Sequence, residues 1–303
     1  MVDHRELLRT LHPDAVVICT PHPSHAAIAR DALDSGAHVL IEKPIAIDVA
    51  DADELLQMSA RSGALVAVNF GERFRPSVER ARTILASGEL GRLIRVSCLQ
   101  TWRREPAYYQ SSPWRGTWRG EGGGVLLNQA PHPLDLLCHL LGSPVRVRGV
   151  TRTLRHAIEC EDTAQALLEY PGGAVGWVAF STAELESQRR LEIVGERATL
   201  LWVDDLLRVH PTAESTSFPG SAEARRVREE LVRDGELDTY LAVHRDLQRA
   251  INEHGRPRCD ARDALPSLEL ANAIQLSAAR NCAVTLPLER AAFTAYLRDR
   301  RAL

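Results

Sequence analysis

The sequence lacks the features that would place it in a membrane, in an oxidising compartment or on nucleic acid. No apolar run approaches the roughly 18–20 residues of a membrane span, and the first residues are charged, unlike a secretory signal. The six cysteines form no Cys-x-x-Cys pair, so we expect no metal site or disulfide framework and a reducing cytoplasm. The net charge of −3 gives no electrostatic reason to expect nucleic acid or a membrane surface as partner.

Lysine is almost absent. Lys43 is the only lysine among 37 lysine and arginine residues. A coding bias toward arginine would deplete lysine everywhere and could leave one by accident. However, a desolvated lysine can lose its proton near neutral pH and an arginine cannot, so a site that needs a titrating amine must keep lysine. We therefore interpret Lys43 as a candidate catalytic residue.

A glycine-rich dinucleotide-binding turn is also missing. Such a turn follows the first strand of a Rossmann fold and places the pyrophosphate at a helix N-terminus. No Gly-x-Gly-x-x-Gly follows an early strand here, and the one glycine cluster, within residues 119–129, has no strand leading into it. We interpret that cluster as a flexible helix start that lets a substrate or cofactor approach the backbone.

The first 70 residues alternate regularly between helix and strand. Three helices and three unbroken apolar strands are expected, the helices at 4–11, 24–36 and 48–63 and the strands at 14–21, 37–44 and 64–70. Strands without polar alternation are typical of a parallel sheet that is buried on both faces. This part of the chain therefore predicts an α/β layer of the nucleotide-binding kind.

The rest of the chain has a different pattern. Strands that alternate apolar and polar residues predict an antiparallel sheet with one wetter face. These strands are expected at 93–102, 145–154, 164–170, 174–182, 189–196 and 198–204, and helices at 74–87, 222–233, 237–254 and 264–281. We predict two domains: residues 1–71 with a partial Rossmann sheet, and residues 72–303 with an α+β architecture around a large, mainly antiparallel open sheet. The helix at 264–281 is the candidate to pack back on the first domain.

Two polar motifs stand at the carboxyl ends of neighbouring strands, where open parallel sheets bind their ligands. Thr20 and Pro21 end one strand, and Glu42 and Lys43 end the next. Pro44 then restricts the chain where it leaves the sheet, which argues against an ordinary solvent-exposed pair. We expect Thr20, Pro21, Glu42 and Lys43 to face one crevice.

A second candidate group lies just after the glycine cluster. Asn128, His132 and Asp135 are spaced at i, i+4 and i+7, which places them on one helical face. Pro131 and Pro133 should kink or restart that helix. A lone histidine is more often structural than catalytic, but the position of His132 between two prolines and beside Asn128 favours a catalytic role.

Aromatic residues make up only 5% of the chain, and many gather in one loop. Residues 101–120 hold three of the five Trp and two of the five Tyr, with four arginines among them. Such a loop can stack on a sugar ring or a nicotinamide, or it can be a surface loop held by arginine–aromatic contacts. Single-stranded nucleic acid is a poor fit for one short loop on an acidic chain.

Several of these stretches, in the same order, resemble the Gfo/Idh/MocA (glucose–fructose oxidoreductase/inositol dehydrogenase) family. They include "HVLIEKPIA", "ERFRPSVERARTILASGELG", "WRGTW" and "GGGVLLNQAPHPLD". The resemblance runs from residue 1 into the C-terminal helix, and it implies an oxidoreductase that uses NAD or NADP and acts on a sugar or polyol. It also implies a Rossmann domain followed by an α/β domain whose open sheet commonly joins subunits, so a homo-oligomer is expected.

The family's motifs assign roles to single positions. Its Glu-Lys-Pro motif places Lys43 in the catalytic site, and its histidine matches His132. The acidic residue often found four positions earlier is Asn128 here; because an amide cannot accept a proton, acid–base work falls more heavily on Lys43 and His132. Cofactor contacts are expected from Thr20, Pro21, His25, Glu42, Lys43, Arg73, Trp114 and Arg115. Substrate contacts are expected from Lys43, Tyr109, Trp118, Asn128 and His132.

The first strand, the glycine fingerprint and the cofactor-selecting acidic residue of that family have no counterpart in this sequence. The missing part corresponds to about two strand–helix units, on the order of 60 residues, which a start codon assigned too late or a true loss would explain. We therefore expect the strand at 15–19 to carry an unpaired apolar edge that invites self-association, and dinucleotide affinity to be weak.

Two other functions stay open. The chain could be a non-catalytic sugar-binding or oligomerisation partner that has lost its cofactor. It could also be a lyase that forms a Schiff base on Lys43. The antiparallel second half argues against the eight-fold barrel that is common among such lyases.

Overall fold

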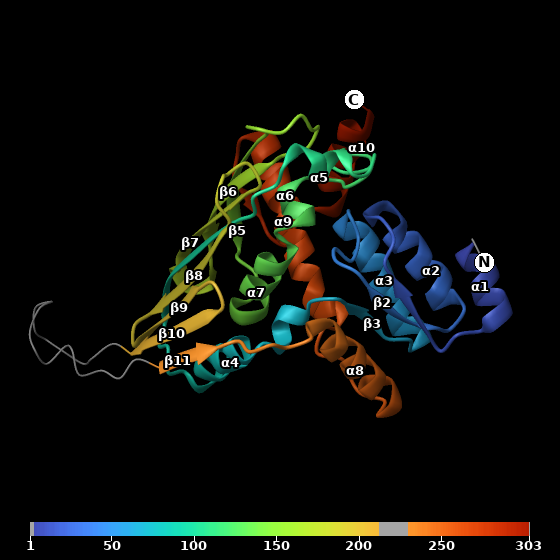
Figure 1. The fold of residues 1–303 in the computed structure, drawn as a ribbon, viewed down its shortest axis with the longest axis horizontal. Coiled ribbons are helices and arrows are strands. Elements are labelled where there is room, and N and C mark those ends of the chain that lie inside the picture. The colour runs from blue at the N-terminus through green and yellow to red at the C-terminus, as the bar shows by residue number, and fades with distance from the viewer. Residues whose placement is uncertain (1–2, 212–229, 303) are drawn as a thin grey trace, which may run out of the picture.

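The computed structural model describes residues 3–211 and 230–302 and shows two sheets with helices between and beside them (Figure 1). The smaller sheet is parallel and has three strands; the larger is mixed and has nine. The predicted fold class, a parallel Rossmann-type sheet joined to an α+β part with a large and mainly antiparallel sheet, is confirmed.

The first 70 residues build the parallel sheet. Its strands lie in the order β1 (Ala15–Ile18), β2 (His38–Ile41) and β3 (Val66–Val68). The three apolar residues Val39, Leu40 and Ile41 of β2 are at most 1% exposed, which explains the unbroken apolar run in the sequence. Within the described residues β1 pairs only with β2, and its other edge carries no strand.

Three helices surround this sheet: α1 (His4–Leu11), α2 (His25–Asp34) and α3 (Val49–Ser62). Capping residues determine where α3 begins and ends. The Asp48 carboxylate caps α3 by accepting a hydrogen bond from the Ala50 amide at 2.9 Å. Gly63 ends the same helix in the left-handed conformation, with φ of 75°. A 3₁₀ turn, η1 (His22–Ser24), joins β1 to α2.

The large sheet has the strand order β11-β10-β9-β8-β4-β7-β6-β5-β12. Only β4 and β7 pair in parallel; the other pairs are antiparallel. The strands are β4 (Leu93–Thr101), β5 (Arg146–Arg152), β6 (Thr163–Glu169), β7 (Val175–Ser181), β8 (Gln188–Gly195), β9 (Ala198–Val203), β10 (Leu206–Pro211), β11 (Glu230–Arg233) and β12 (Val284–Thr285).

The remaining helices come after the parallel sheet. They are η2 (Gly71–Phe74), α4 (Pro76–Ser87), α5 (Pro106–Gln110), α6 (Val125–Asn128), α7 (Pro131–Leu141), η3 (Pro171–Gly173), α8 (Thr239–Asn252), α9 (Ala261–Arg280) and α10 (Arg290–Ala302). No helix in the described part of the chain is long and apolar enough to cross a membrane. The same residues contain no group of three or more His, Cys, Asp or Glu that could hold a metal ion.

Helix α9 runs between the two sheets (Figure 1) and contacts α3 and β3 on one side and α7 and β5 on the other. Asn272 joins α9 to the segment that follows β2 of the parallel sheet. Its side-chain amide donates to the Ile47 carbonyl at 3.1 Å and accepts from the Val49 amide at 3.0 Å. Because both bonds are buried, they fix the loop after β2 against α9.

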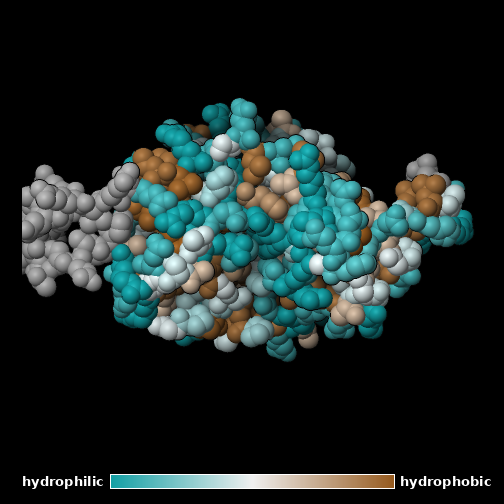
Figure 2. Space-filling view, turned by 90° about the horizontal axis from the view of Figure 1, so that it is seen from below, coloured by the Kyte–Doolittle hydropathy of each residue, from teal (hydrophilic) through white to brown (hydrophobic). Residues whose placement is uncertain are grey.

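The outer face of the large sheet has no helix over it in the described structure, whereas α7 and α9 cover the inner face (Figure 1). Burial alternates along β6 accordingly: Ala164, Ala166 and Leu168 are buried, while Gln165 and Leu167 are exposed. Figure 2, which views the molecule from below, shows hydrophobic residues in separate patches on a mostly hydrophilic face.

One expected helix needs correction, two elements were not expected, and one expected helix break is confirmed. Residues 230–233, expected within a helix at 222–233, form β11, and residues 222–229 lie outside the described part of the chain. The strand β10 and the helix α10 were not expected, although both pack into the fold. The helix at residues 125–141 is indeed interrupted between Asn128 and Pro131, as the prolines predicted.

Candidate active site

Lys43 leaves the carboxyl end of β2 and meets the end of α6. Its Nζ donates a hydrogen bond to the Asn128 backbone carbonyl at 2.6 Å. Burial lowers the pKa of Lys43 below its usual range; Glu42 and Glu121 oppose this shift, and the charges of Arg115 and Arg104 reinforce it. The ammonium therefore gives up its proton more readily than that of an ordinary surface lysine.

His132 stands beside Lys43 in the first turn of α7. Its ring meets the Phe70 ring edge to face at 5.9 Å, and its Nδ1 atom is buried without a hydrogen-bond partner. Burial, and then the positive charge of Lys43, lower the pKa of His132 to about 4. The imidazole is thus neutral at pH 7, and its Nδ1 atom makes no hydrogen bond within the described part of the chain.

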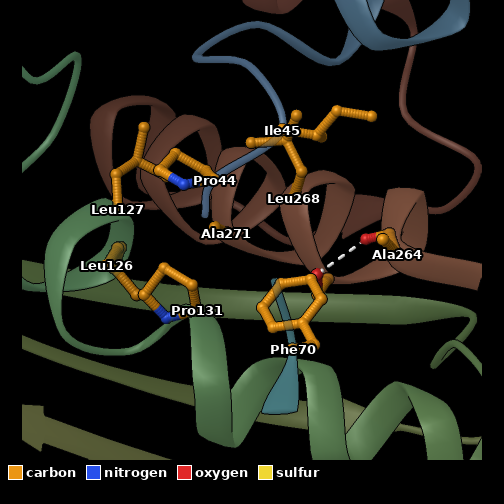
Figure 3. A pocket seen from close by; sticks show the side chains of 10 residues that line it. Pro44, Ile45, Phe70, Leu126, Leu127, Pro131, Ala264, Leu268 and Ala271 are labelled. Carbon is orange, nitrogen blue, oxygen red and sulfur yellow. Dashed lines mark hydrogen bonds between the residues drawn. The ribbon is translucent and has the colours of Figure 1, made fainter. Parts of the chain in front are cut away.

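The two residues that follow Lys43 pack tightly against neighbouring helices (Figure 3). Pro44 and Ile45, which follow Lys43, converge with Leu127 of α6, Pro131 of α7 and Leu268 of α9 around a void of about 10 Å³. That volume is at the lower limit for one water molecule. The loop that carries Lys43 is therefore fixed against the helices that carry Asn128 and His132.

Asn128 is held by a carboxyl group that the sequence analysis missed. Its side-chain amide donates to Oε1 of Glu121, and Oε2 of Glu121 accepts from the Gly116 amide at 2.6 Å. Glu121 has no exposed surface, and burial raises its pKa to about 7. Only its place directly before the glycine cluster could have drawn attention to it.

The glycine cluster itself does not leave space for a ligand. A Cβ on Gly122 would lie 2.0 Å from an Ile47 side-chain atom, one on Gly123 2.1 Å from Gln275, and one on Gly124 1.8 Å from the Glu161 carbonyl oxygen. These glycines therefore permit close packing of the loop against protein atoms. The expectation of a flexible helix start that a ligand approaches is not supported at these three positions.

Four residues of the aromatic loop and one residue of η1 line the same region. The Arg104 and Arg115 guanidinium groups lie 4.7 Å and 4.4 Å from the Tyr108 ring centre. Arg115 also stacks on Trp114 at 4.7 Å, and the Trp114 ring lies 5.5 Å from the ring of His22. His22 and Tyr108 were not among the predicted site residues.

The predicted substrate residues Tyr109 and Trp118 are engaged elsewhere. The Tyr109 hydroxyl hydrogen-bonds Thr182 at 2.7 Å, and its ring packs against His156. The Trp118 indole donates to the Glu159 carbonyl at 3.2 Å, and its ring meets Tyr296 of α10. Both side chains are nearly buried in these contacts, so the structure gives them packing roles and favours Tyr108 in the site.

Thr20 and Pro21, predicted at the end of β1, lie at the same edge of the parallel sheet as Glu42. The residues of this edge differ in their exposure and in their hydrogen-bond partners. Thr20 and Pro21 are exposed, and the Glu42 carboxylate accepts a hydrogen bond from Asn69 at 2.7 Å. His25 is buried, with Nε2 at 2.7 Å from the Thr20 carbonyl and Nδ1 at 2.8 Å from the Pro44 carbonyl. It therefore joins the ends of β1 and β2 and has no nitrogen left for a ligand.

Arg73 is not available to a cofactor in this structure. It is fully buried, and it donates to the Asp135 carboxylate through Nε at 2.9 Å and Nη2 at 2.5 Å. It also donates to the carbonyls of Arg258 and Asp263. These bonds join η2, α7 and α9, so Arg73 and Asp135 have a structural role, and the prediction that Arg73 contacts a cofactor is not supported.

A parallel α/β sheet with a lysine at its carboxyl edge, packed against a second and larger sheet, is typical of nucleotide-binding α/β proteins. The chain belongs to the Gfo/Idh/MocA family of oxidoreductases. Residues 1–70 match the family described as "Oxidoreductase family, NAD-binding Rossmann fold", and residues 78–201 match the "GFO/IDH/MocA C-terminal domain".

Individual relatives agree with this assignment. The uncharacterized oxidoreductase YrbE of Bacillus subtilis is 23% identical over 94% of this chain and 81% of its own length. The D-apiose dehydrogenase of Paraburkholderia graminis is 27% identical over 94% of this chain and 76% of its own length. The chain spans between 50% and 81% of the length of several curated relatives that it matches.

A solved structure is similar over most of the chain. The WlbA dehydrogenase of Bordetella pertussis, in complex with NADH and UDP-GlcNAcA, matches with a TM-score of 0.80 and 26% identity. The alignment covers 95% of this chain and 83% of WlbA. The arrangement of the two sheets is thus that of the family.

Proposed function

We propose that the protein is an oxidoreductase that moves a hydride between a nicotinamide cofactor and a carbinol carbon of a sugar or polyol. The observation that carries this proposal is the contact of Lys43 with α6, beside neutral His132, at the carboxyl edge of the parallel sheet. Residues 1–71 would hold the cofactor and residues 72–303 the substrate. Several relatives, among them the D-apiose dehydrogenase, support a sugar-like substrate.

The residues present fit the nicotinamide end of such a cofactor. The sheet edge at Thr20, the stacked pair of Trp114 and Arg115, and the buried free nitrogen of His132 offer donors and an aromatic face together. When bound, the nicotinamide ring supplies the position that accepts or returns the hydride. The described residues contain no glycine-rich turn for the pyrophosphate, so Thr20, Trp114 and Arg115 would make the main contacts.

Proton transfer would depend on Lys43 and His132. The Asn128 carbonyl fixes one N–H of Lys43, which orients the amine, and burial lowers its pKa, so the amine loses its proton more readily than an exposed lysine does. In the direction of oxidation, Lys43 takes the proton of the substrate hydroxyl, and in reduction it returns it. Neutral His132 positions the same oxygen through its unpaired ring nitrogen. General acid–base catalysis of this kind contributes about 10²–10⁴-fold.

The first experiment measures binding and turnover separately. NADH and NADPH are titrated by calorimetry, and NAD(P)-linked turnover is followed over a panel of sugars and polyols. We expect binding of one cofactor, and we expect Lys43→Arg to bind it normally but to lose turnover, since arginine cannot release its proton.

Other outcomes would separate the alternatives. Sugar binding without cofactor binding would indicate the non-catalytic partner. A borohydride-stable adduct on Lys43 that mass spectrometry locates after incubation with a carbonyl substrate would indicate the lyase. Undiminished turnover of Lys43→Arg would contradict the assigned role of Lys43.

A further inference from the structure

Two guanidinium groups in the candidate site have no carboxylate partner among the described residues. Both Arg104 and Arg115 stack on Tyr108, and Arg115 donates to the Tyr108 hydroxyl at 2.6 Å. The Nε atom of each arginine is buried and has no hydrogen-bond partner. Buried donors are normally satisfied, so each is a place where a ligand acceptor is missing.

The two arginines lie beside the chain that carries Asn128. Tyr108, on which both arginines stack, accepts a hydrogen bond from Gln129, the residue after Asn128, at 3.1 Å. The carboxyl groups of this region have other partners: Glu121 accepts from Gly116 and Asn128, and Glu42 accepts from Asn69. Because neither carboxyl group forms an ion pair with Arg104 or Arg115 in the described part of the chain, both guanidinium groups can pair with an anionic group on a ligand.

The two arginines share the Tyr108 ring but differ in their other contacts and in the elements they follow. Arg115 stacks on Trp114, which in turn meets His22 at the end of β1, and so belongs to the side of the parallel sheet. Arg104 comes three residues after β4 and belongs to the side of the large sheet. The cofactor is proposed to bind along the parallel sheet, so Arg104 is left for the substrate.

We propose that the substrate carries a carboxylate and that Arg104 binds it, which makes the preferred substrates sugar acids rather than neutral sugars. This inference rests on the proposed function, because it identifies the Lys43 site as the substrate site. A guanidinium binds a carboxylate through two parallel N–H···O bonds, a geometry that a neutral hydroxymethyl group cannot satisfy. Stacking on Tyr108 holds the Arg104 plane in position for it.

The test uses matched pairs of acid and neutral sugars and does not require turnover. D-glucuronate and D-glucose, D-galacturonate and D-galactose, and UDP-GlcNAcA and UDP-GlcNAc are titrated against the full chain, with tryptophan fluorescence as the readout. We expect the acid of at least one pair to bind about tenfold or more tightly than its neutral partner. Arg104→Gln should reduce that ratio to near one, and Arg104→Lys should restore part of it.

Arg103→Gln is the matched control. Arg103 is the neighbouring residue, but its guanidinium is exposed and already paired with Glu105, so the acid-to-neutral ratio should stay at the wild-type value. Thermal melts of the three variants show whether the fold is retained. Calorimetry with NADH tests whether Arg104 serves the cofactor phosphates instead.

The outcomes separate this inference from the proposed function. No acid preference in any pair, or an acid preference that survives in Arg104→Gln, would overturn the inference. A loss of NADH affinity in Arg104→Gln with an unchanged sugar ratio would overturn it in favour of a cofactor contact. Turnover of neutral sugars that ignores Arg104 would leave the dehydrogenase proposal standing, whereas acid binding without any turnover would leave only the inference standing.

Discussion

At the scale of single residues, the candidate site depends on the four charged groups that act on the Lys43 amine. Lys43 titrates under the influence of Glu121 and Glu42, which raise its pKa, and of burial and two arginines, which lower it. Glu121 is the buried member of this set, and with its own pKa at about 7 it changes its charge around neutral pH. The ionisation of Glu121 therefore contributes to the pKa of the amine, beside the larger effects of burial and of Glu42.

This coupling predicts a shift in the pH–rate profile. In the direction of oxidation, kcat/KM should rise with pH as Lys43 loses its proton. Glu121→Gln removes a negative charge that stabilises the ammonium, so the pKa of Lys43 falls further and the midpoint of the profile moves to lower pH. Glu105→Gln, an exposed carboxylate on the same loop, should leave the midpoint unchanged. A midpoint that stays or moves upward in Glu121→Gln would contradict the coupling.

A second prediction compares two histidines on one helix. His132 and His139 both lie on α7, both have a buried ring nitrogen without a partner, and burial lowers both pKa values, to about 4 and about 3. Only His132 lies beside Lys43. His132→Asn should reduce kcat about 100-fold, whereas His139→Asn should affect thermal stability alone. Steady-state kinetics and melts of both variants decide this, and equal kcat losses would assign His132 a packing role.

Sequence alone can predict site residues from signals that lie close along the chain, but not contacts between residues that are far apart in the sequence. Lys43 and His132 were predicted because a strand end and a proline-flanked helix start are local signals. Tyr109 was preferred to Tyr108, because a sequence does not show which of two adjacent side chains turns toward Thr182. Glu121 and Arg73 depend on partners brought together by the fold.

At the scale of elements, the loop before α6 depends on another buried carboxyl group. Oε1 of Glu161 accepts from the amides of Gly124 and Leu126 at 2.9 Å and 3.2 Å, while Oε2 has no partner. The Gln275 side-chain oxygen on α9 also lacks a partner. Burial raises the pKa of Glu161 to about 7, although the hydrogen bonds from the Gly124 and Leu126 amides lower it, so the neutral acid predominates below pH 7.

Stability should therefore fall as this group ionises. The unfolded state has the ordinary glutamate pKa of 4.5 and the folded state about 7, so the stabilisation is complete below pH 4.5 and is lost as the pH rises through 7. The loss amounts to at most about 3 kcal/mol. Glu161→Gln, which stays neutral, should lose less stability between pH 5 and 8 than the wild type does.

Denaturant unfolding at several pH values measures this difference. At each pH the free energy of unfolding of the variant is subtracted from that of the wild type. This difference removes the opposite contribution of the buried histidines His22 and His132, whose lowered pKa values make stability rise with pH. Glu169→Gln on β6, an exposed carboxylate, serves as the control. A wild-type curve parallel to that of Glu161→Gln would show that Glu161 is ionised in the folded state throughout.

The elements themselves were predictable where their pattern was strong. The three apolar strands of the first sheet and most strands of the second were expected within a few residues of their bounds, since burial imposes the pattern directly. The order of the large sheet was not predictable, because β4 pairs with β7 and β8 from distant parts of the chain. Short elements such as α5 and β12 have too few residues to show a period.

At the scale of the whole molecule, the outer face of the large sheet is the feature that the described fold leaves uncovered. Val150, Leu167, Val175 and Trp177 are 50%, 62%, 56% and 40% exposed there. Leu167 of β6 lies directly opposite Trp177 of β7, so the apolar side chains are neighbours across the strands. Apolar patches of this kind commonly mark a protein–protein interface.

We predict that this face joins copies of the chain, because pairing two such faces would remove the exposed apolar side chains from water. Light scattering after size exclusion should give a multiple of the monomer mass for the wild type. Leu167→Glu and Trp177→Glu each place a charge in the paired surface and should shift the mass toward the monomer. Leu11→Glu, at a similarly exposed leucine on α1, should not. If the masses of both sheet variants equal that of an oligomeric wild type, the contact lies elsewhere, and the edge of β1 becomes the surface to test.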